Sequence, residues 1–88
     1  MNYDYDLLVQ EKRELTRELT EIYGIYPESI ITNIMHYNVM ENTPKEYVSI
    51  YCKDLDIGFS CGTEKSQMSN CVKCYKMLIE YIKNNYQK

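Results

Sequence analysis

Four cysteines lie in the last 37 residues of this 88-residue chain, and two of them form the motif Cys71-Val-Lys-Cys74. A chain of this length forms one domain whose hydrophobic core alone provides little stability, so cross-links or metals often support such folds. Thiols at this density usually form disulfides or bind a metal. The choice between these two fates constrains the fold of the C-terminal half.

The N-terminal segment and the overall hydropathy favour reduced thiols. Residues 1–6 are acidic and aromatic and lack the basic and apolar regions of a secretory signal. No apolar run approaches the roughly 18 residues that a bilayer span requires. We therefore expect a cytoplasmic protein, in which cysteines stay reduced and a metal is favoured over disulfides.

The charges are divided unevenly between the two halves of the chain. Residues 1–51 carry four basic and nine acidic side chains, a balance of −5, whereas residues 52–88 carry six and four, a balance of +2. A protein that binds duplex DNA usually has a stronger, Arg-rich basic footprint. The charge pattern argues against nucleic acid as the main partner but leaves a contact through the C-terminal helix open.

A first helix is predicted from Asp4 or Asp6, either of which can cap it, to about Tyr23, before Gly24. Its apolar stripe repeats every seven residues over two heptads, which leaves a dimer through this helix open. A neighbouring stripe is acidic. This acidic stripe is either a solvated surface or a docking surface for a basic partner, and its members are Glu11, Glu14, Glu18 and Glu21.

A second helix is predicted to begin at Pro27 and to fade by Asn38, because four apolar residues in between form a wide face. The only histidine, His36, lies near its end, and we interpret it as a structural residue rather than a ligand. Residues 38–44 are expected to form a loop.

Alternation of apolar residues predicts a β-hairpin over residues 47–61. A turn at residues 53–56 sets Cys52 opposite Ile57, and the two strand cysteines then lie about 13 Å apart. A turn at residues 55–58, with Gly58 at positive φ, sets Cys52 directly opposite Cys61. The glycine and the chemistry of a metal site favour the second register.

The last helix is predicted to start after Ser69 or Asn70 and to run to about Asn84. Its first turn places Cys71 and Cys74 on one face, where the helix N-terminus stabilises thiolates. Together with the hairpin cysteines this arrangement predicts a structural zinc site with the ligands Cys52, Cys61, Cys71 and Cys74. An iron–sulfur cluster, redox chemistry by the Cys71/Cys74 pair and four buried apolar thiols are the alternatives.

The stretch Cys52–Tyr75, with spaced cysteines ending in Cys-Val-Lys-Cys-Tyr before an amphipathic helix, resembles the zinc-ribbon or treble-clef tails of small proteins from phages and mobile elements. The resemblance implies a structural metal and a role inside a bacterial host cell, including anti-CRISPR-type inhibition of defence proteins.

The combined prediction is an α+β fold over residues 1–88, with a helical part in 1–40 and a hairpin plus helix in 45–88 clipped by metal. No catalytic motif is present, so we expect a non-enzymatic module that binds a host protein as inhibitor or adaptor. The alternative is a nucleic-acid-binding regulator that uses the hairpin and the last helix, through Lys73, Lys76 and Lys83 with Tyr75 or Tyr81.

Overall fold

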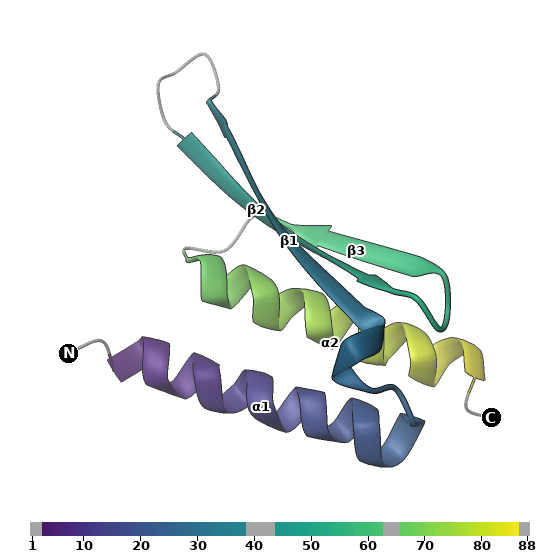
Figure 1. Cartoon of the computed structure of the whole chain (residues 1–88). Helices are drawn as coiled ribbons and strands as arrows, with labels where there is room; N and C mark the ends of the chain where they lie inside the picture. The colour runs from purple at the N-terminus through teal and green to yellow at the C-terminus, as the bar shows by residue number, and fades with distance from the viewer. Residues whose placement is uncertain (1–2, 39–43, 63–65, 87–88) are drawn as a thin grey trace.

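The computed structural model describes residues 3–38, 44–62 and 66–86. These form an α+β fold in the order α1 (Tyr3–Tyr23), a 3-10 turn (Pro27–Ser29), β1 (Ile30–Asn38), β2 (Pro44–Cys52), β3 (Ile57–Cys61) and α2 (Gln67–Tyr86). The strands make one antiparallel sheet in the order β1-β2-β3. Figure 1 shows the sheet above α2, with α1 running along α2.

The helix predicted from Pro27 to Asn38 is wrong. Pro27 does open a helical turn, but this turn is three residues long and leads directly into the nine-residue strand β1. His36 and the end of the predicted helical part therefore belong to a strand. Three β-branched isoleucines in this segment favour a strand, because their restricted χ1 rotamers suit a pleated surface better than a helix. The described residues consequently form one N-terminal helix and three strands, whereas two N-terminal helices and a two-stranded hairpin were expected.

Both remaining helices form where the sequence predicts them, but their first turns differ from the prediction. Asp4 and Asp6 lie inside α1, which already begins at Tyr3. The side chain of Ser66 caps α2, since its Oγ accepts a hydrogen bond from the backbone N–H of Ser69 at 3.1 Å. The last helix thus begins at Gln67, ahead of the predicted caps Ser69 and Asn70.

Gly24 ends α1 as predicted, with a φ of +72°. The chain then folds back, and the N–H of Ile25 donates to the carbonyl of Leu19 at 2.9 Å. Ile25 is buried against the core, so this reversal fixes how the chain leaves the helix.

Replacing Gly24 with Ala should lower the free energy of unfolding by about 1 kcal/mol, because a Cβ is disfavoured at positive φ. Nothing lies within 4 Å of the added atom, so the cost comes from the backbone alone. Urea denaturation measures it, and Gly24→Asn serves as the matched control. Asn tolerates this conformation and should lose less stability than Ala; equal losses for both variants would contradict the explanation.

The core lies between α2 and the sheet and continues to α1. In the C-terminal half of β2 the alternate residues Val48, Ile50 and Cys52 face α2 and are almost fully buried, as are the residues of α2 that meet them. Leu19 of α1 and Leu78 of α2 are both 0% exposed and belong to the same cluster. The other buried side chains of this cluster are Ile25, Val48, Ile50, Tyr75, Ile79, Ile82 and the four cysteines.

Neither helix in the described part of the chain has the length and hydropathy that a crossing of the bilayer needs.

Candidate functional site

The register of the β2–β3 hairpin separates the two strand cysteines. Val48 pairs with Cys61, and Cys52 pairs with Ile57. The turn therefore uses Asp56, not Gly58, at positive φ (53°), a conformation that Asp tolerates. The hydroxyl of Tyr51 also donates a hydrogen bond to the Asp56 carboxylate, which holds this turn. The register with Cys52 opposite Cys61 is wrong, and the alternative register is the one observed.

All four cysteines are buried free thiols. The Cys74 thiol donates to the carbonyl of Val48 at 3.3 Å, and the Cys61 thiol donates to Asn70 Oδ1 at 3.3 Å. Asn70, which is 1% exposed, is therefore a core residue and not the predicted helix cap. The thiols serve as packed hydrogen-bonding groups within the core.

Three of the thiols are close enough to influence one another. Burial raises the pKa of Cys74 to about 11, and the neighbouring Cys61 and Cys71 contribute in the same direction. Burial also raises the pKa of Cys71, although the charge of Lys12 opposes this shift. These raised pKa values mean that Cys71 and Cys74 keep their protons at neutral pH in the metal-free protein.

The predicted four-cysteine clip is therefore wrong. Among the residues that the structure describes, which include all four cysteines, no three His, Cys, Asp or Glu side chains are grouped in a way that could hold a metal ion. The cause is the hairpin register, which puts Cys52 four residues along the strand from the position opposite Cys61. Zinc content of the protein stays a prediction, and elemental analysis of protein purified without added metal tests it.

The four glutamates of the predicted acidic docking stripe on α1 lie in different surroundings. Glu11 turns toward α2 and forms an ion pair with Lys76, with Oε2 and Nζ 2.6 Å apart. Glu21 lies 3.6 Å from Arg17 in an exposed pair on the same helix. Glu14 is exposed and Glu18 is half-buried. Two of the four carboxylates thus have partners within the chain, which weakens the stripe as a surface for a basic partner.

Replacing Glu11 with Gln should lower the free energy of unfolding by about 0.5 kcal/mol at low salt, because both partners are partly exposed. Glu14→Gln is the matched control and should change stability less. Urea titrations at low and high ionic strength measure the effect. A loss of stability for Glu11→Gln that does not shrink in high salt would contradict an ion pair.

Strand β1 lies at one edge of the sheet. It pairs only with β2, along nine consecutive residue pairs from Ile30↔Cys52 to Asn38↔Pro44, so its other side is an open edge of the described sheet. Its sequence contains no Asp, Glu, Lys, Arg or Pro. Natural proteins usually protect such edges with charges, prolines, bulges or short strands. β1 has none of these features along its paired length.

Two isoleucines of β1 are exposed, one on each face of the sheet. Ile31 is 43% exposed and Ile34 is 44% exposed. Ile34 lies opposite Val48 and therefore points to the helix side, yet Val48 is only 1% exposed. The helix layer that buries β2 thus stops short of β1.

A hollow of about 580 Å³ lies along α1. Its wall is formed by eight residues of α1, four of them charged, and by two residues outside this helix. They are Tyr5, Val9, Lys12, Arg13, Thr16, Arg17, Thr20, Glu21, Pro27 and Met68. Thr16 and Thr32 both hydrogen-bond to the hydroxyl of Tyr75, which links this side of α1 to β1. We call this hollow the α1 groove.

The spacing of the layers explains why the α1 groove is open. α2 packs against β2 and β3, and α1 packs against α2. Packed helices lie about 8–10 Å apart, whereas neighbouring strands are about 4.8 Å apart, so two helices span more width than three strands cover. Thr16, which lines the α1 groove, and Thr32 of β1 both contact Tyr75, so the α1 groove lies on the β1 side of α2.

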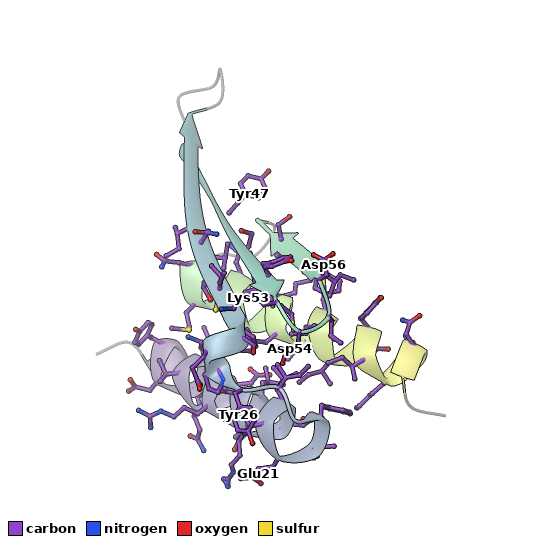
Figure 2. The ribbon with its side chains drawn as sticks, turned by 45° about the vertical axis from the view of Figure 1, so that its right-hand side comes forward. Glu21, Tyr26, Tyr47, Lys53, Asp54 and Asp56 are labelled. Carbon is purple, nitrogen blue, oxygen red and sulfur yellow. The ribbon has the colours of Figure 1, made fainter. Side chains whose placement is uncertain are left out.

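Figure 2 shows where the ends of this layer lie. The turn residues Lys53, Asp54 and Asp56 are at the end of the sheet near Tyr26, which belongs to the connection between α1 and β1. This connection is tied to the hairpin turn, because the N–H of Lys53 donates to the carbonyl of Ser29 and the Ser29 hydroxyl donates to Asp54 Oδ1 at 3.0 Å. These bonds fix the start of β1 and hold its open edge in place.

None of the site residues predicted from the sequence belongs to β1. The available signal was the run Ile30-Ile31-Thr32-Asn33-Ile34, which is rich in β-branched residues and free of charge. No family model, curated protein or solved structure matches this chain.

Proposed function

We propose that this protein is a non-enzymatic binding module that accepts an extended strand of a partner protein at the open edge of β1. The observation that carries the proposal is the open edge of this nine-residue strand, which has exposed isoleucines at positions 31 and 34 and lies near the α1 groove. In strand addition, backbone hydrogen bonds provide affinity and alternate side chains provide specificity. A partner strand with apolar residues on one face would bury them in the α1 groove.

The runner-up, binding of nucleic acid by α2, has less support. Lys76 is paired with Glu11, and Tyr75 is 6% exposed. Tyr81 packs edge-on against Phe59, with ring centroids 6.0 Å apart. Stacking on a base requires an accessible aromatic face, and these two tyrosines are used within the protein.

The prediction that the partner is a host defence protein rests on the resemblance of residues 52–75 to phage and mobile-element proteins. The geometry of β1 concerns the mode of binding and is independent of the partner's identity. Identification of the partner is therefore a separate step.

Replacing Ile34 with Lys should weaken partner binding at least about tenfold, because it puts a charge on the helix side of the open edge. The protein is used as bait in bacterial extracts, captured proteins are identified by mass spectrometry, and affinities are then measured with the purified partner. Ile22→Lys is the matched control, because Ile22 is 62% exposed on α1 and lies outside the α1 groove.

Equal affinities for the parent chain and Ile34→Lys would contradict binding at β1. Affinity for nucleic acid that falls steeply with salt and is insensitive to Ile34→Lys would favour the runner-up instead.

A further inference from the structure

The basic residues of α1 are gathered along the α1 groove. The helix carries six acidic and three basic side chains, so its overall charge is negative. All three basic residues nevertheless line the α1 groove, together with one acidic residue, and these four are Lys12, Arg13, Arg17 and Glu21. A negatively charged helix therefore presents a groove whose wall is mainly basic.

Two stripes of different exposure run along the α1 groove. Val9, Thr16 and Thr20 are half-buried, whereas Arg13 and Arg17 are exposed. The two arginines are four residues apart, which makes them neighbours on one face of the helix. The α1 groove thus has a half-buried inner stripe without charge and a pair of guanidinium groups at its outer rim.

The contacts within the chain leave these two guanidinium groups available to a partner. Arg17 lies 3.6 Å from Glu21, but both side chains of this pair are exposed, and such pairs contribute little. An incoming carboxylate can therefore replace Glu21 at small cost. Lys12 is used differently, because its Nζ lies 5.8 Å from the centroid of the buried Tyr75 ring.

We propose that the partner segment is acidic, with carboxylates placed against Arg13 and Arg17 and apolar side chains against the inner stripe of the α1 groove. The proposal rests on the proposed function, because it names the kind of strand that the β1 edge accepts. A guanidinium group pairs with a carboxylate through two parallel hydrogen bonds, which adds specificity to the attraction. The acidic stripe had instead suggested a basic partner.

One segment can reach both the β1 edge and the α1 groove. Thr16 in the groove and Thr32 of β1 both hydrogen-bond to the Tyr75 hydroxyl. Two hydroxyl groups that share one partner atom lie within about 6 Å of each other. β1 contains no Asp or Glu, so no like charge opposes the carboxylates of an acidic strand.

A nucleic acid fits this wall less well than an acidic segment. Its phosphates form a continuous row of charge, whereas Glu21 lies in the groove itself and Glu14 is exposed on the same helix. Carboxylates this close to the arginines repel a polyanion. A segment with a few spaced carboxylates and apolar residues between them avoids most of this repulsion.

Three synthetic peptides of the same length as β1 test the proposal by fluorescence anisotropy. The acidic peptide is built on the repeat Thr-Val-Thr-Glu, which puts valine and glutamate on one face of a strand and threonine on the other. Gln replaces Glu in the neutral peptide, and Lys replaces it in the basic one. At low salt the acidic peptide should bind at least about fivefold more tightly than the neutral one, and the basic peptide most weakly. High salt should reduce this preference.

Arg13→Glu should remove the preference for the acidic peptide and leave the affinity for the neutral peptide within about twofold of the parent value. Lys83→Glu is the matched control, because Lys83 is exposed on α2, lies outside the α1 groove and gives the same change in net charge. This variant should keep the preference. Both positions are exposed, and thermal unfolding verifies that both variants fold.

Equal affinities for the acidic and neutral peptides, or equal effects of Arg13→Glu and Lys83→Glu, overturn the proposal. An oligothymidylate that binds more tightly than the acidic peptide and is weakened by Arg13→Glu overturns it in favour of nucleic acid. If the neutral peptide binds as well as the acidic one and Ile34→Lys abolishes its binding, only the acidic partner is removed and strand addition at β1 stands. If no peptide binds, the acidic partner is also overturned, and the capture experiment decides the proposed function separately.

Discussion

Replacing Leu78 with Ala should lower the free energy of unfolding by about 3 kcal/mol. Leu78 is 0% exposed in the middle of α2, in the cluster that joins Leu19 of α1 to Val48 and Ile50 of β2. Truncation removes buried apolar surface and leaves a cavity between three elements, and such substitutions cost about 2–5 kcal/mol. Because small domains are stable by about 5–15 kcal/mol in total, the loss is a large fraction of the whole.

Urea denaturation followed by far-ultraviolet circular dichroism measures this loss at one fixed protein concentration, since association would shift the transition. Ile22→Ala is the matched control, because this side chain is 62% exposed and its truncation should change stability by less than about 0.5 kcal/mol. A loss below about 1 kcal/mol for Leu78→Ala would contradict the central position of α2 in the core.

Local signals in the sequence were sufficient for the two helices and the β2–β3 hairpin. The leucine stripe with Gly24 predicts α1, and the alternation of Val48, Ile50 and Cys52 predicts the buried face of β2. Each of these signals is a hydrophobic periodicity or a terminating residue that belongs to the element itself. The start of α2 was misplaced only because Ser66, Ser69 and Asn70 are all suitable caps.

The β1 segment could not be assigned from its own pattern. Ile30, Ile31, Ile34 and Met35 recur at spacings that fit a helical face, and Pro27 suits a helix start. What makes the segment a strand is its pairing with β2 over nine residues, a contact that its own periodicity does not encode. Tertiary pairing has overridden a local signal, as often happens for short apolar runs.

The prediction of the four-cysteine clip is wrong because it assumed the other register of the β2–β3 hairpin. Gly58 favours a turn at residues 55–58, whereas the observed turn has Asp56 at positive φ. In the observed register Cys61 lies opposite Val48 and not opposite Cys52. Spacing in the sequence shows which thiols share an element, as for Cys71 and Cys74, but the distance between elements depends on the turn. The same buried thiols nevertheless have a measurable role in stability.

Raising the pH through the alkaline range should destabilise the protein through Cys74. Its pKa is raised from the ordinary value of 9.0 to about 11, first by burial and then by Cys61 and Cys71. The unfolded chain therefore loses the thiol proton at lower pH than the folded protein. The stabilising contribution is complete below about pH 9, where both states hold the proton, and it is lost as the pH rises from there toward about 11.

Urea denaturation under reducing conditions at about pH 8 and about pH 10.5 measures this effect as a fall in the free energy of unfolding. Cys74→Ala is the control, because it removes the titrating group from the same position. The variant should be less stable at about pH 8, where it lacks the hydrogen bond to the Val48 carbonyl. Its stability should then fall less steeply with pH than that of the parent.

Other groups explain why the free energy of unfolding of Cys74→Ala should still fall as the pH rises. Burial also raises the pKa of Cys71 and of Tyr75, and a hydrogen bond to Asp56 raises that of Tyr51. These groups act in the same direction and are still present in the variant. The difference between the two slopes therefore reports the Cys74 thiol together with its effect on Cys61 and Cys71. Identical slopes in both proteins would show that the Cys74 thiol is accessible to water and ionises as freely as in the unfolded chain.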